Sequence, residues 1–321
     1  MAIISVNNLS KTYRSTKKTG NVFKDFFLRQ YEVKTAVSQV SFTVYEPEFI
    51  GFVGPNGAGK STTMKMLAGI LSPSEGKIEV LGSDPFLKKK EYLKQIAFIM
   101  GQKNQLLWDL PAVDTFLVNK EIYEIEDSVY KKTVGELSEL LNCKEIITQP
   151  VKTLSLGQRM RVELISSLLH SPKILFLDEP TIGLDIFAQT IIVKFIKEYQ
   201  KLYNATVILT SHYMKDIQQL AKRIILIDHG KIIHDGTFAD LVQTNSLNKH
   251  ISVVLSGELD ESKMKEKNIS YQYDRPVVTF VIEKQRIGEI VSWITSTFEY
   301  SDLSIEDEPI EEVIKKVFTK H

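Results

Sequence analysis

The sequence has little cysteine, no excess of positive charge and no long hydrophobic run, and each of these absences excludes a class of protein. It contains one cysteine, Cys143, in 321 residues, so an intramolecular disulfide is excluded and a reducing compartment is expected. Cys143 itself is interpreted as a small buried hydrophobic residue. Basic and acidic residues number 40 each, so no surplus of positive charge exists for general nucleic-acid binding. We therefore expect no nucleic-acid partner.

Long hydrophobic runs are missing as well. No stretch of about 18 consecutive apolar residues occurs, so we expect no membrane-spanning segment. The amino-terminal sequence MAIISVNNLS lacks a basic start followed by a long apolar segment, so we expect no secretory signal. What remains is an ordinary globular composition, 43% hydrophobic and 25% charged, at a length that predicts two or three domains.

The most informative stretch is residues 52–63, FVGPNGAGKSTT, which contains the spacing G-x-x-x-x-G-K-S between an apolar strand-like run and a helical pattern. In such a loop, backbone N–H groups and the start of the following helix surround phosphate oxygens. We expect Lys60 to contact the outer phosphates and Ser61 to offer its hydroxyl to Mg²⁺. The residues expected to bind the nucleotide here are Gly54, Pro55, Asn56, Gly57, Ala58, Gly59, Lys60, Ser61 and Thr62.

A second motif lies at residues 174–180, where the apolar run ILFL ends in Asp178 and Glu179. Open α/β sheets bind ligands at the carboxyl ends of their strands, so Asp178 is expected to hold Mg²⁺ through water. Glu179 can point at the γ-phosphate and position or deprotonate the attacking water. The alternative, two acidic residues that begin a solvent-exposed loop, is less favoured because the preceding strand is fully apolar.

Three further motifs make the chain resemble the nucleotide-binding subunits of ABC transporters. Residues 154–158, LSLGQ, resemble the signature motif of this family, with Leu156 where glycine is usual. Residues 180–185, PTIGLD, resemble the D-loop, and residues 210–212, TSH, resemble the switch-histidine motif. The motifs follow one another in the order of the family, and ATP and Mg²⁺ are the ligands that the resemblance implies.

The resemblance also implies roles for individual residues. Tyr13 resembles the aromatic residue that stacks on adenine. Gln102 resembles the Q-loop glutamine, with Gln105 as the alternative. The implied catalytic residues are Glu179, His212 and Gln102. The implied Mg²⁺ ligands are Ser61, Gln102 and Asp178. The signature and D-loop residues implied to meet a nucleotide are Ser155, Gly157, Gln158 and Asp185.

The signature motif is expected on a helical block, away from the P-loop of its own chain. Ser155 and the N–H of Gly157 would then contact a phosphate held by a second protomer, at the start of a helix expected at 158–170. The resemblance thus implies a homodimer that holds two ATP molecules head to tail and opens when the γ-phosphates are lost. A separate integral membrane permease is the implied partner, which places the chain at the cytoplasmic face of the membrane.

The expected fold class is α/β, a P-loop ABC ATPase core with a mixed sheet and a helical subdomain, followed by a small α+β accessory domain. We expect the nucleotide-binding domain at residues 1–245, with its helical subdomain at about 103–170 and an insertion at 14–33. The accessory domain is expected at 246–321, after the polar stretch TNSLN. The expected strands lie at 2–9, 36–45, 48–53, 77–81, 96–100, 174–177, 206–210, 224–227, 231–234, 252–256 and 277–283. The expected helices lie at 62–70, 87–95, 112–124, 129–141, 158–170, 189–202, 286–298 and 308–318.

The insertion has two interpretations. Its apolar positions 22, 23, 26, 27 and 31 would share one face of a helix. That helix either packs on its own domain or lies at a membrane interface, with its lysine and arginine side chains near the headgroups.

Several kinds of ABC protein and P-loop enzyme compete for the function. A ribosomal or DNA-repair ABC protein is less favoured because the chain has one P-loop and no sustained heptads. A P-loop kinase or GTPase would not explain the signature motif or His212. Residues 101–111 resemble drug and viologen exporter ATPases, whereas the insertion resembles polysaccharide and teichoic-acid exporters. We expect export of a drug-like or amphiphilic substrate, with residues 105–124 on the permease, Trp108 exposed as an anchor and Phe116 buried.

Overall fold

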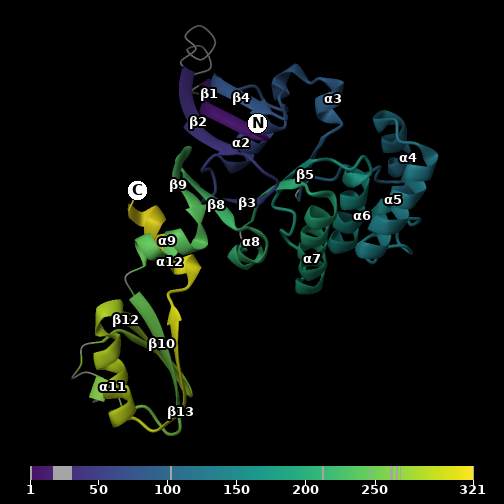
Figure 1. Cartoon of the computed structure of the whole chain (residues 1–321). Coiled ribbons are helices and arrows are strands. Elements are labelled where there is room, and N and C mark those ends of the chain that lie inside the picture. Colours follow the sequence, from purple (N-terminus) through teal and green to yellow (C-terminus); the bar gives the residue numbers. More distant parts are fainter. Residues whose placement is uncertain are drawn as a thin grey trace, which may run out of the picture. The chain divides into compact units, whose positions relative to one another are not determined.

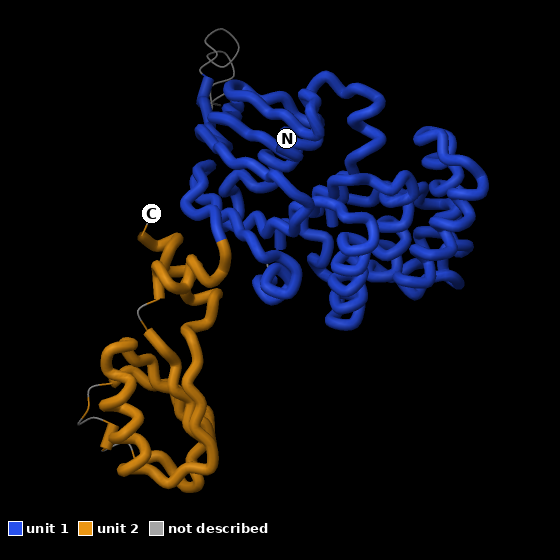
Figure 2. The backbone as a smooth tube through the Cα atoms, viewed as in Figure 1, with its two compact units in different colours: residues 1–236 blue, residues 237–321 orange. Residues whose placement is uncertain are grey.

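The computed structural model describes residues 2–16, 31–101, 103–211, 213–246, 248–260, 263–264, 267 and 269–320 (Figure 1). They form two compact units, residues 1–236 and 237–321 (Figure 2). Gln102 and His212 lie outside the described residues, and so does the amphipathic pattern of the insertion except for Tyr31, which is in a strand. Among the described helices, none is both long and apolar enough to cross a membrane.

A six-stranded sheet forms the centre of the first unit, in the order β5-β6-β7-β3-β8-β9. Its strands are β3 (Phe49–Val53), β5 (Ile96–Met100), β6 (Ile174–Asp178), β7 (Thr206–Thr210), β8 (Arg223–Asp228) and β9 (Lys231–Thr237). The pairs from β5 to β8 are parallel, and every residue of β3 and β7 is buried, as continuous apolar runs predict. The carboxyl ends of β3, β5, β6 and β7 therefore share one edge of the sheet.

A second, antiparallel sheet has the order β2-β1-β4, with β1 at Ile4–Thr16, β2 at Tyr31–Val44 and β4 at Glu75–Val80. The strands predicted at 2–9 and 36–45 were too short, because the ladder continues through polar residues to the pair Thr16 and Tyr31. Both ends of the expected insertion at 14–33 thus belong to this ladder.

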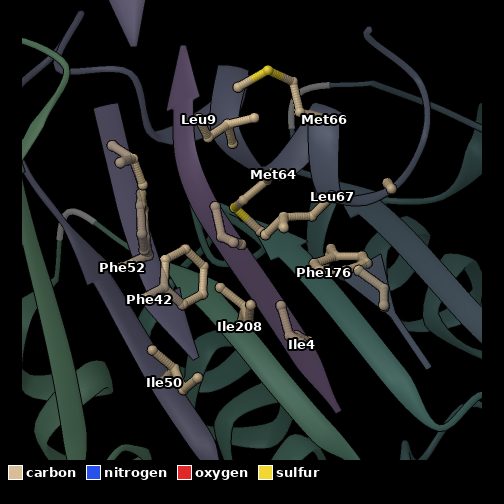
Figure 3. Close-up of a cluster of buried hydrophobic side chains, with 14 of the residues drawn as sticks. Ile4, Leu9, Phe42, Ile50, Phe52, Met64, Met66, Leu67, Phe176 and Ile208 are labelled. Atoms are coloured by element: carbon tan, nitrogen blue, oxygen red, sulfur yellow. The ribbon is translucent and has the colours of Figure 1, made fainter. Parts of the chain in front are cut away.

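The core of the first unit lies between the two sheets and surrounds the helix α2 (Lys60–Leu67). Figure 3 shows Met64 and Leu67 of α2 among side chains from β1, β2, β3 and β6, including Phe42 and Phe176. The rings of Phe42 and Phe52 lie 6.3 Å apart, centroid to centroid. Because α2 is buried on several sides, the loop at its N-terminus is held in place by the core.

Helices cover the rest of the first unit. They are α3 (Lys90–Leu93), α4 (Ala112–Tyr123), α5 (Asp127–Leu140), α6 (Leu156–Leu168), α7 (Ile186–Tyr203) and α8 (Met214–Leu220). The helix predicted at 87–95 was wrong in length: a 3₁₀ turn, η1 (Pro85–Leu87), precedes the short α3. Lys88 between them has a φ of 48°, which a continuous right-handed helix cannot include.

The second unit holds a four-stranded antiparallel sheet in the order β11-β12-β10-β13, and its described helices include α9, α11 and α12. The elements are α9 (Phe238–Asn245), β10 (Asn248–Leu255), β11 (Tyr271–Asp274), β12 (Val277–Glu283), a 3₁₀ turn η3 (Lys284–Arg286), α11 (Ile287–Thr297), β13 (Tyr300–Asp307) and α12 (Ile310–Lys320). Phe280, Ile290 and Ile294 are buried between the sheet and α11. The domain boundary expected after Asn245 falls at the end of α9, which packs against α12 within the second unit.

Candidate functional site

The loop between β3 and α2 has the backbone that the P-loop spacing predicts. Gly59 precedes the first residue of α2 and has a φ of 107°, in the region that favours glycine. A Cβ atom there would lie 2.5 Å from the carbonyl oxygen of Ala36, so β2 leaves no room for a side chain. The loop can therefore curve closely, with the free N–H groups at the start of α2 facing its interior.

Lys60, the first residue of α2, is buried and bends back over the loop. Its Nζ donates to the carbonyl oxygens of Gly54 at 2.6 Å and Pro55 at 3.1 Å. Burial lowers the pKa of the Lys60 ammonium, and the charges of Glu179 and Asp178 raise it. A buried cation beside N–H groups that point inward is the arrangement that phosphate oxygens complement, so the residues present fit a triphosphate.

The two acidic residues at the end of β6 are oriented by the neighbouring strand. Thr210, the last residue of β7, donates its hydroxyl to Oδ1 of Asp178 at 2.8 Å. The same hydroxyl accepts from the N–H of Glu179 at 3.0 Å. Glu179 has a φ of 56°, an uncommon value for a residue with a side chain and one that often marks functional sites. Asp178 and Glu179 thus leave the sheet in a fixed arrangement at its carboxyl edge.

Gly101, which follows β5, completes this edge. Its N–H donates to the carbonyl oxygen of Asp178 at 3.0 Å. A Cβ atom on Gly101 would lie only 2.0 Å from the carbonyl oxygen of Glu179. Glycine is required because the backbone of Glu179 occupies the space of a side chain.

Two cavities lie between the P-loop and the carboxyl edge of the sheet. We call the first, of about 300 Å³, the nucleotide cavity, and the second, of about 160 Å³, the carboxylate cavity. The nucleotide cavity is lined by Tyr13, Lys34, Ala36, Asn56, Gly57, Gly59, Lys60, Ser61, Thr62 and Glu179. The carboxylate cavity is lined by Ser61, Lys65, Met100, Lys103, Asp178 and Glu179. Ser61 and Glu179 line both cavities, so the hydroxyl expected at Mg²⁺ and the carboxylate expected at the attacking water lie where the two cavities adjoin. Asp178, the carboxylate expected at Mg²⁺, lines the carboxylate cavity.

Sequence reasoning missed Lys34, Lys65 and Lys103. Lys34 pairs with Tyr13 across the ladder of β1 and β2, a register that the sequence does not reveal. Lys65 is one turn along α2 from Ser61, so its place could have been found from helical spacing. A larger cavity, of about 560 Å³, lies beside β4 and η1 and contains none of the expected site residues.

The signature residues lie at a different place in the first unit. Ser155 caps α6: its Oγ accepts from the N–H of Gln158 at 3.2 Å, and the Gln158 side chain accepts from the N–H of Ser155 at 2.9 Å. Asp185 caps α7 by accepting from the N–H of Ala188 at 2.8 Å. A Cβ atom on Gly157 would lie 2.6 Å from Cβ of Ala188, so the N-termini of α6 and α7 touch.

Ser155, Gly157, Gln158 and Asp185 are absent from the described lining of both the nucleotide cavity and the carboxylate cavity. The structure therefore does not bring the signature motif to the P-loop of its own chain. Gln102 and His212 cannot be placed, and their roles stay predictions.

Gln105, the alternative Q-loop residue, is engaged elsewhere. Its side-chain amide donates to the carbonyl oxygen of Phe98 at 3.0 Å, and it lines a third cavity, of about 380 Å³, between β5, α4 and α6. Gln105 is thus engaged outside the nucleotide and carboxylate cavities, and the choice of Gln102 as the Q-loop residue stays a prediction. In the same segment Phe116 is fully buried and Trp108 is 48% exposed, as the sequence predicts.

Comparison with known proteins places the chain in a family. Residues 37–182 match the family model described as ABC transporter. The chain is 33% identical over 229 residues to the linearmycin resistance ATP-binding protein LnrL of Bacillus subtilis, covering 71% of this chain and 73% of that protein. It is 32% identical over 230 residues to the bacitracin transport ATP-binding protein BcrA of Bacillus licheniformis, covering 72% and 73%.

Solved structures agree on the fold. The ATP-binding cassette MJ0796, in a dimeric post-hydrolysis state with ADP and Pi, matches with a TM-score of 0.62 and 23% identity over 73% of this chain and 98% of that chain. The expected fold class, a P-loop ATPase core with a helical subdomain and a small α+β domain, is confirmed. The chain belongs to the ABC transporter family, as an ATP-binding subunit that binds and hydrolyses ATP.

Proposed function

We propose that this subunit works as a head-to-tail homodimer at the cytoplasmic face of the membrane, where it powers export of a drug-like or amphiphilic substrate through a separate permease. One observation carries the dimer: the signature residues Ser155 and Gly157 do not line the phosphate site of their own chain. Their helix, α6, begins with free N–H groups that suit an anion, so a second protomer must supply the phosphate.

The chemistry of the site follows from the side chains that meet there. Lys60 supplies a positive charge to the β- and γ-phosphates, and the N–H groups of the loop hold their oxygens. Ser61 and Asp178 offer the oxygen ligands that Mg²⁺ prefers, and the ion would supply neutralisation of charge between the β- and γ-phosphates. Glu179 orients the attacking water and accepts its proton. Through its hydroxyl, Thr210 contacts the carboxylate of Asp178 and the backbone N–H of Glu179.

The substrate class is supported by the relatives. LnrL is named for linearmycin resistance and BcrA for bacitracin transport, and each matches about seven tenths of this chain. Resistance to one named compound and transport of another support a drug-like substrate. The resemblance of residues 101–111 to drug and viologen exporter ATPases supports the same substrate class. The polysaccharide or teichoic-acid alternative depends on the insertion, which lies largely outside the described residues.

Residues 105–124 are the proposed contact with the permease. They adjoin the third cavity, whose walls include the apolar side chains of Ile70, Leu93 and Ile122, all exposed. Ile122 lies on α4, and Trp108 lies just before this helix. A cavity with exposed apolar walls suits an amphipathic helix of the permease, since such helices insert their apolar face into grooves, and the exposed ring of Trp108 offers a second apolar contact in the same segment.

Mixing two defective variants tests the head-to-tail site. Lys60→Ala removes the phosphate contact, and Ser155→Arg blocks the signature motif, so each protein alone should lack ATPase activity. In a mixture, half of the dimers would be mixed and would carry one intact composite site, which restores roughly a quarter of the parental sites. No recovery, with both variants folded and mixed dimers formed, would contradict a site built from two protomers.

Glu179→Gln should separately keep ATP binding and slow hydrolysis by about two to four orders of magnitude.

A further inference from the structure

A short segment between β4 and β5 presents apolar and basic side chains next to each other in solvent. Phe86 is 52% exposed and Leu87 is 61% exposed, and three exposed lysines follow directly, at Lys88, Lys89 and Lys90. Single exposed apolar residues are common and need no explanation. Here two of them adjoin a run of positive charge, and the nucleotide site uses none of these residues. We call residues 86–90 the basic tip.

The basic tip has a buried base on both sides. Pro85, which precedes it, is buried, and a Cβ atom on Gly69 would lie 2.2 Å from the carbonyl oxygen of Pro85. Tyr92, which follows it, is also buried and donates its hydroxyl to the carbonyl oxygen of Leu67 at 2.5 Å. Both flanks therefore pack against the end of α2, and the basic tip between them is held outward by the fold.

The charge of this segment is mainly positive. From residue 85 to residue 95 the sequence contains four lysines and a single glutamate. Two neighbouring carboxylates are occupied within the fold: Asp84 caps η1, and Glu124 pairs with two of the lysines. Within the part of the chain that the structure describes, Lys88 and Lys89 have no ion pair. Their ammonium groups are therefore available to an external anion.

Apolar side chains beside lysines favour a lipid surface over a protein surface. Lysine is depleted at the centre of protein interfaces, whereas an anionic leaflet attracts lysines close to it. Phe86 and Leu87 could enter the boundary between headgroups and acyl chains while the neighbouring ammonium groups stay among the headgroups. A soluble polyanion would engage the lysines but leave both apolar side chains in water.

The basic tip also adjoins the face on which the permease is proposed to dock. It ends at Lys90, the first residue of α3, and Leu93 of the same helix lines the third cavity together with Ile122 of α4. Helices α3 and α4 are joined by an ion pair between Lys94 and Glu124 at 2.6 Å, and Figure 1 shows them as neighbours. A membrane protein docked on this face would bring the basic tip close to the bilayer.

We propose that the basic tip contacts an anionic lipid surface beside the permease. Phe86 and Leu87 lie at the boundary of the headgroups and acyl chains, and Lys88 and Lys89 lie at the headgroup phosphates. This inference rests on the proposed place at the cytoplasmic face of the membrane, and it adds a lipid contact made by this chain itself. It is independent of the membrane interpretation of the insertion, because the two segments share no residue.

The experiment measures co-sedimentation of the full chain with vesicles of phosphatidylcholine, either alone or with about one third phosphatidylglycerol. The parent should bind the anionic vesicles more tightly, and less so as salt rises. The double variant Lys88→Gln and Lys89→Gln should bind them about tenfold to thirtyfold more weakly, since each lysine near such a surface contributes about fivefold. The double variant Phe86→Ser and Leu87→Ser should lose about tenfold or more.

The matched control is Lys201→Gln with Leu202→Ser at the end of α7, where a lysine and a leucine that is 68% exposed are also adjacent. It should bind vesicles as the parent does. All variants should keep the melting temperature and ATP affinity of the parent, because exposed side chains contribute little to folding. If the serine variant melts lower, the glutamine variant decides, because it removes no apolar side chain.

The outcomes separate this inference from the proposed function. A parent that binds neither kind of vesicle, or tip variants that bind within threefold of the parent, would overturn the lipid contact. An equal loss in the control would also overturn it, because the effect would not be specific to the basic tip. If the parent ignores vesicles but both tip variants lose the permease, the basic tip contacts protein. In each case the proposed dimer and export function stand, because variant mixing and permease co-purification test them without vesicles.

Discussion

Thr210, at the end of β7, donates its hydroxyl hydrogen to Oδ1 of Asp178 on the neighbouring strand β6, at a distance of 2.8 Å. Through the same oxygen it accepts the N–H of Glu179 at 3.0 Å. One buried hydroxyl thus contacts the carboxylate proposed for Mg²⁺ and the backbone N–H of the residue whose carboxylate is proposed for water. Because both contacts depend on β6 and β7 being neighbours, the arrangement is a product of the sheet order.

Replacing Thr210 by valine should slow hydrolysis while leaving ATP binding intact. Valine has nearly the shape of threonine, but it leaves the Asp178 oxygen without its donor. A hydrogen bond to a charged group contributes about 1.5–3 kcal/mol, so kcat should fall by roughly tenfold to a hundredfold. Thr210→Ser keeps the hydroxyl and should retain most of the activity. Equal rates for the valine and serine variants would remove the hydroxyl from any positioning role.

Gly101→Ala should disturb the same two carboxylates from β5, the neighbour of β6 on the side away from β7. The new Cβ atom would meet the carbonyl oxygen of Glu179 at 2.0 Å, so the backbone of Glu179 must shift. We expect a tenfold or larger loss of kcat, and overpacking of this kind costs about 1–3 kcal/mol of stability. Gly135→Ala is the control, because a Cβ atom there meets nothing within 4 Å in the middle of α5. It should stabilise the protein slightly, and a matching loss in both variants would contradict the prediction.

The sequence predicts this site well where a motif is continuous in the chain. The P-loop, Asp178 and Glu179 have fixed spacing next to apolar strands, and the strand predicted at 206–210 matches β7 to the residue. It could not predict Thr210 as the link between the two acids, or Lys34 beside Tyr13, because both depend on strand pairing. Pairing registers are decided by contacts between distant segments.

The missed elements have local causes. All residues of β11 are exposed, and β13 is mostly polar, so neither strand shows the alternation that marks a half-buried strand. Both lie at the edges of their sheet, where one side has no neighbouring strand. The helix predicted at 87–95 has suitable residues throughout, yet the left-handed backbone of Lys88 divides it. Helix propensity is a weak predictor at single positions, so it does not reveal this break.

A chain that ends at residue 236 should be folded and soluble, whereas a chain that ends at residue 245 should aggregate more readily. The first unit, 1–236, has its own core, so a chain ending there should fold and bind ATP with the affinity of the parent. A chain ending at 245 keeps α9 without α12, which exposes the buried side chain of Leu241. It should bind more of a hydrophobic dye and aggregate more readily. If the shorter chain fails to bind ATP, the second unit is needed for the ATPase fold.

Trp108→Ala should separate the subunit from its permease without affecting its own fold. Trp108 is half exposed, and its only described ring contact is with the guanidinium of Arg159, 5.7 Å from the ring centre. We expect the melting temperature and basal ATPase rate to stay near those of the parent, while co-purification with the permease falls. Phe116→Ala is the contrast: its ring is fully buried, and its loss should cost about 3–5 kcal/mol of stability. A complex of full strength with Trp108→Ala would place the interface elsewhere.

The last prediction concerns Glu163, which lies on α6 and is 1% exposed. Its carboxyl group accepts a hydrogen bond from the backbone N–H of Gln105, and it therefore ties the segment after Gln102 to the helix of the signature motif. Burial raises the pKa of Glu163 to about 7, against the opposing effects of the Arg159 charge and the Gln105 hydrogen bond.

This shift makes the free energy of unfolding depend on pH. Between about pH 4.5 and 7 the folded protein keeps a proton that the unfolded chain releases. The favourable contribution is therefore complete below pH 4.5 and disappears as the pH rises through 7, a loss on the order of 3 kcal/mol. Glu163→Gln keeps an oxygen acceptor for Gln105 and cannot ionise. In denaturant titrations from pH 5 to 8, the free energy of unfolding of the variant should increase relative to that of the parent as the pH rises. The control is Glu126→Gln, which replaces an exposed acid and should show the same pH dependence of the free energy of unfolding as the parent. If Glu163→Gln also showed the pH dependence of the parent, Glu163 would not titrate in this range.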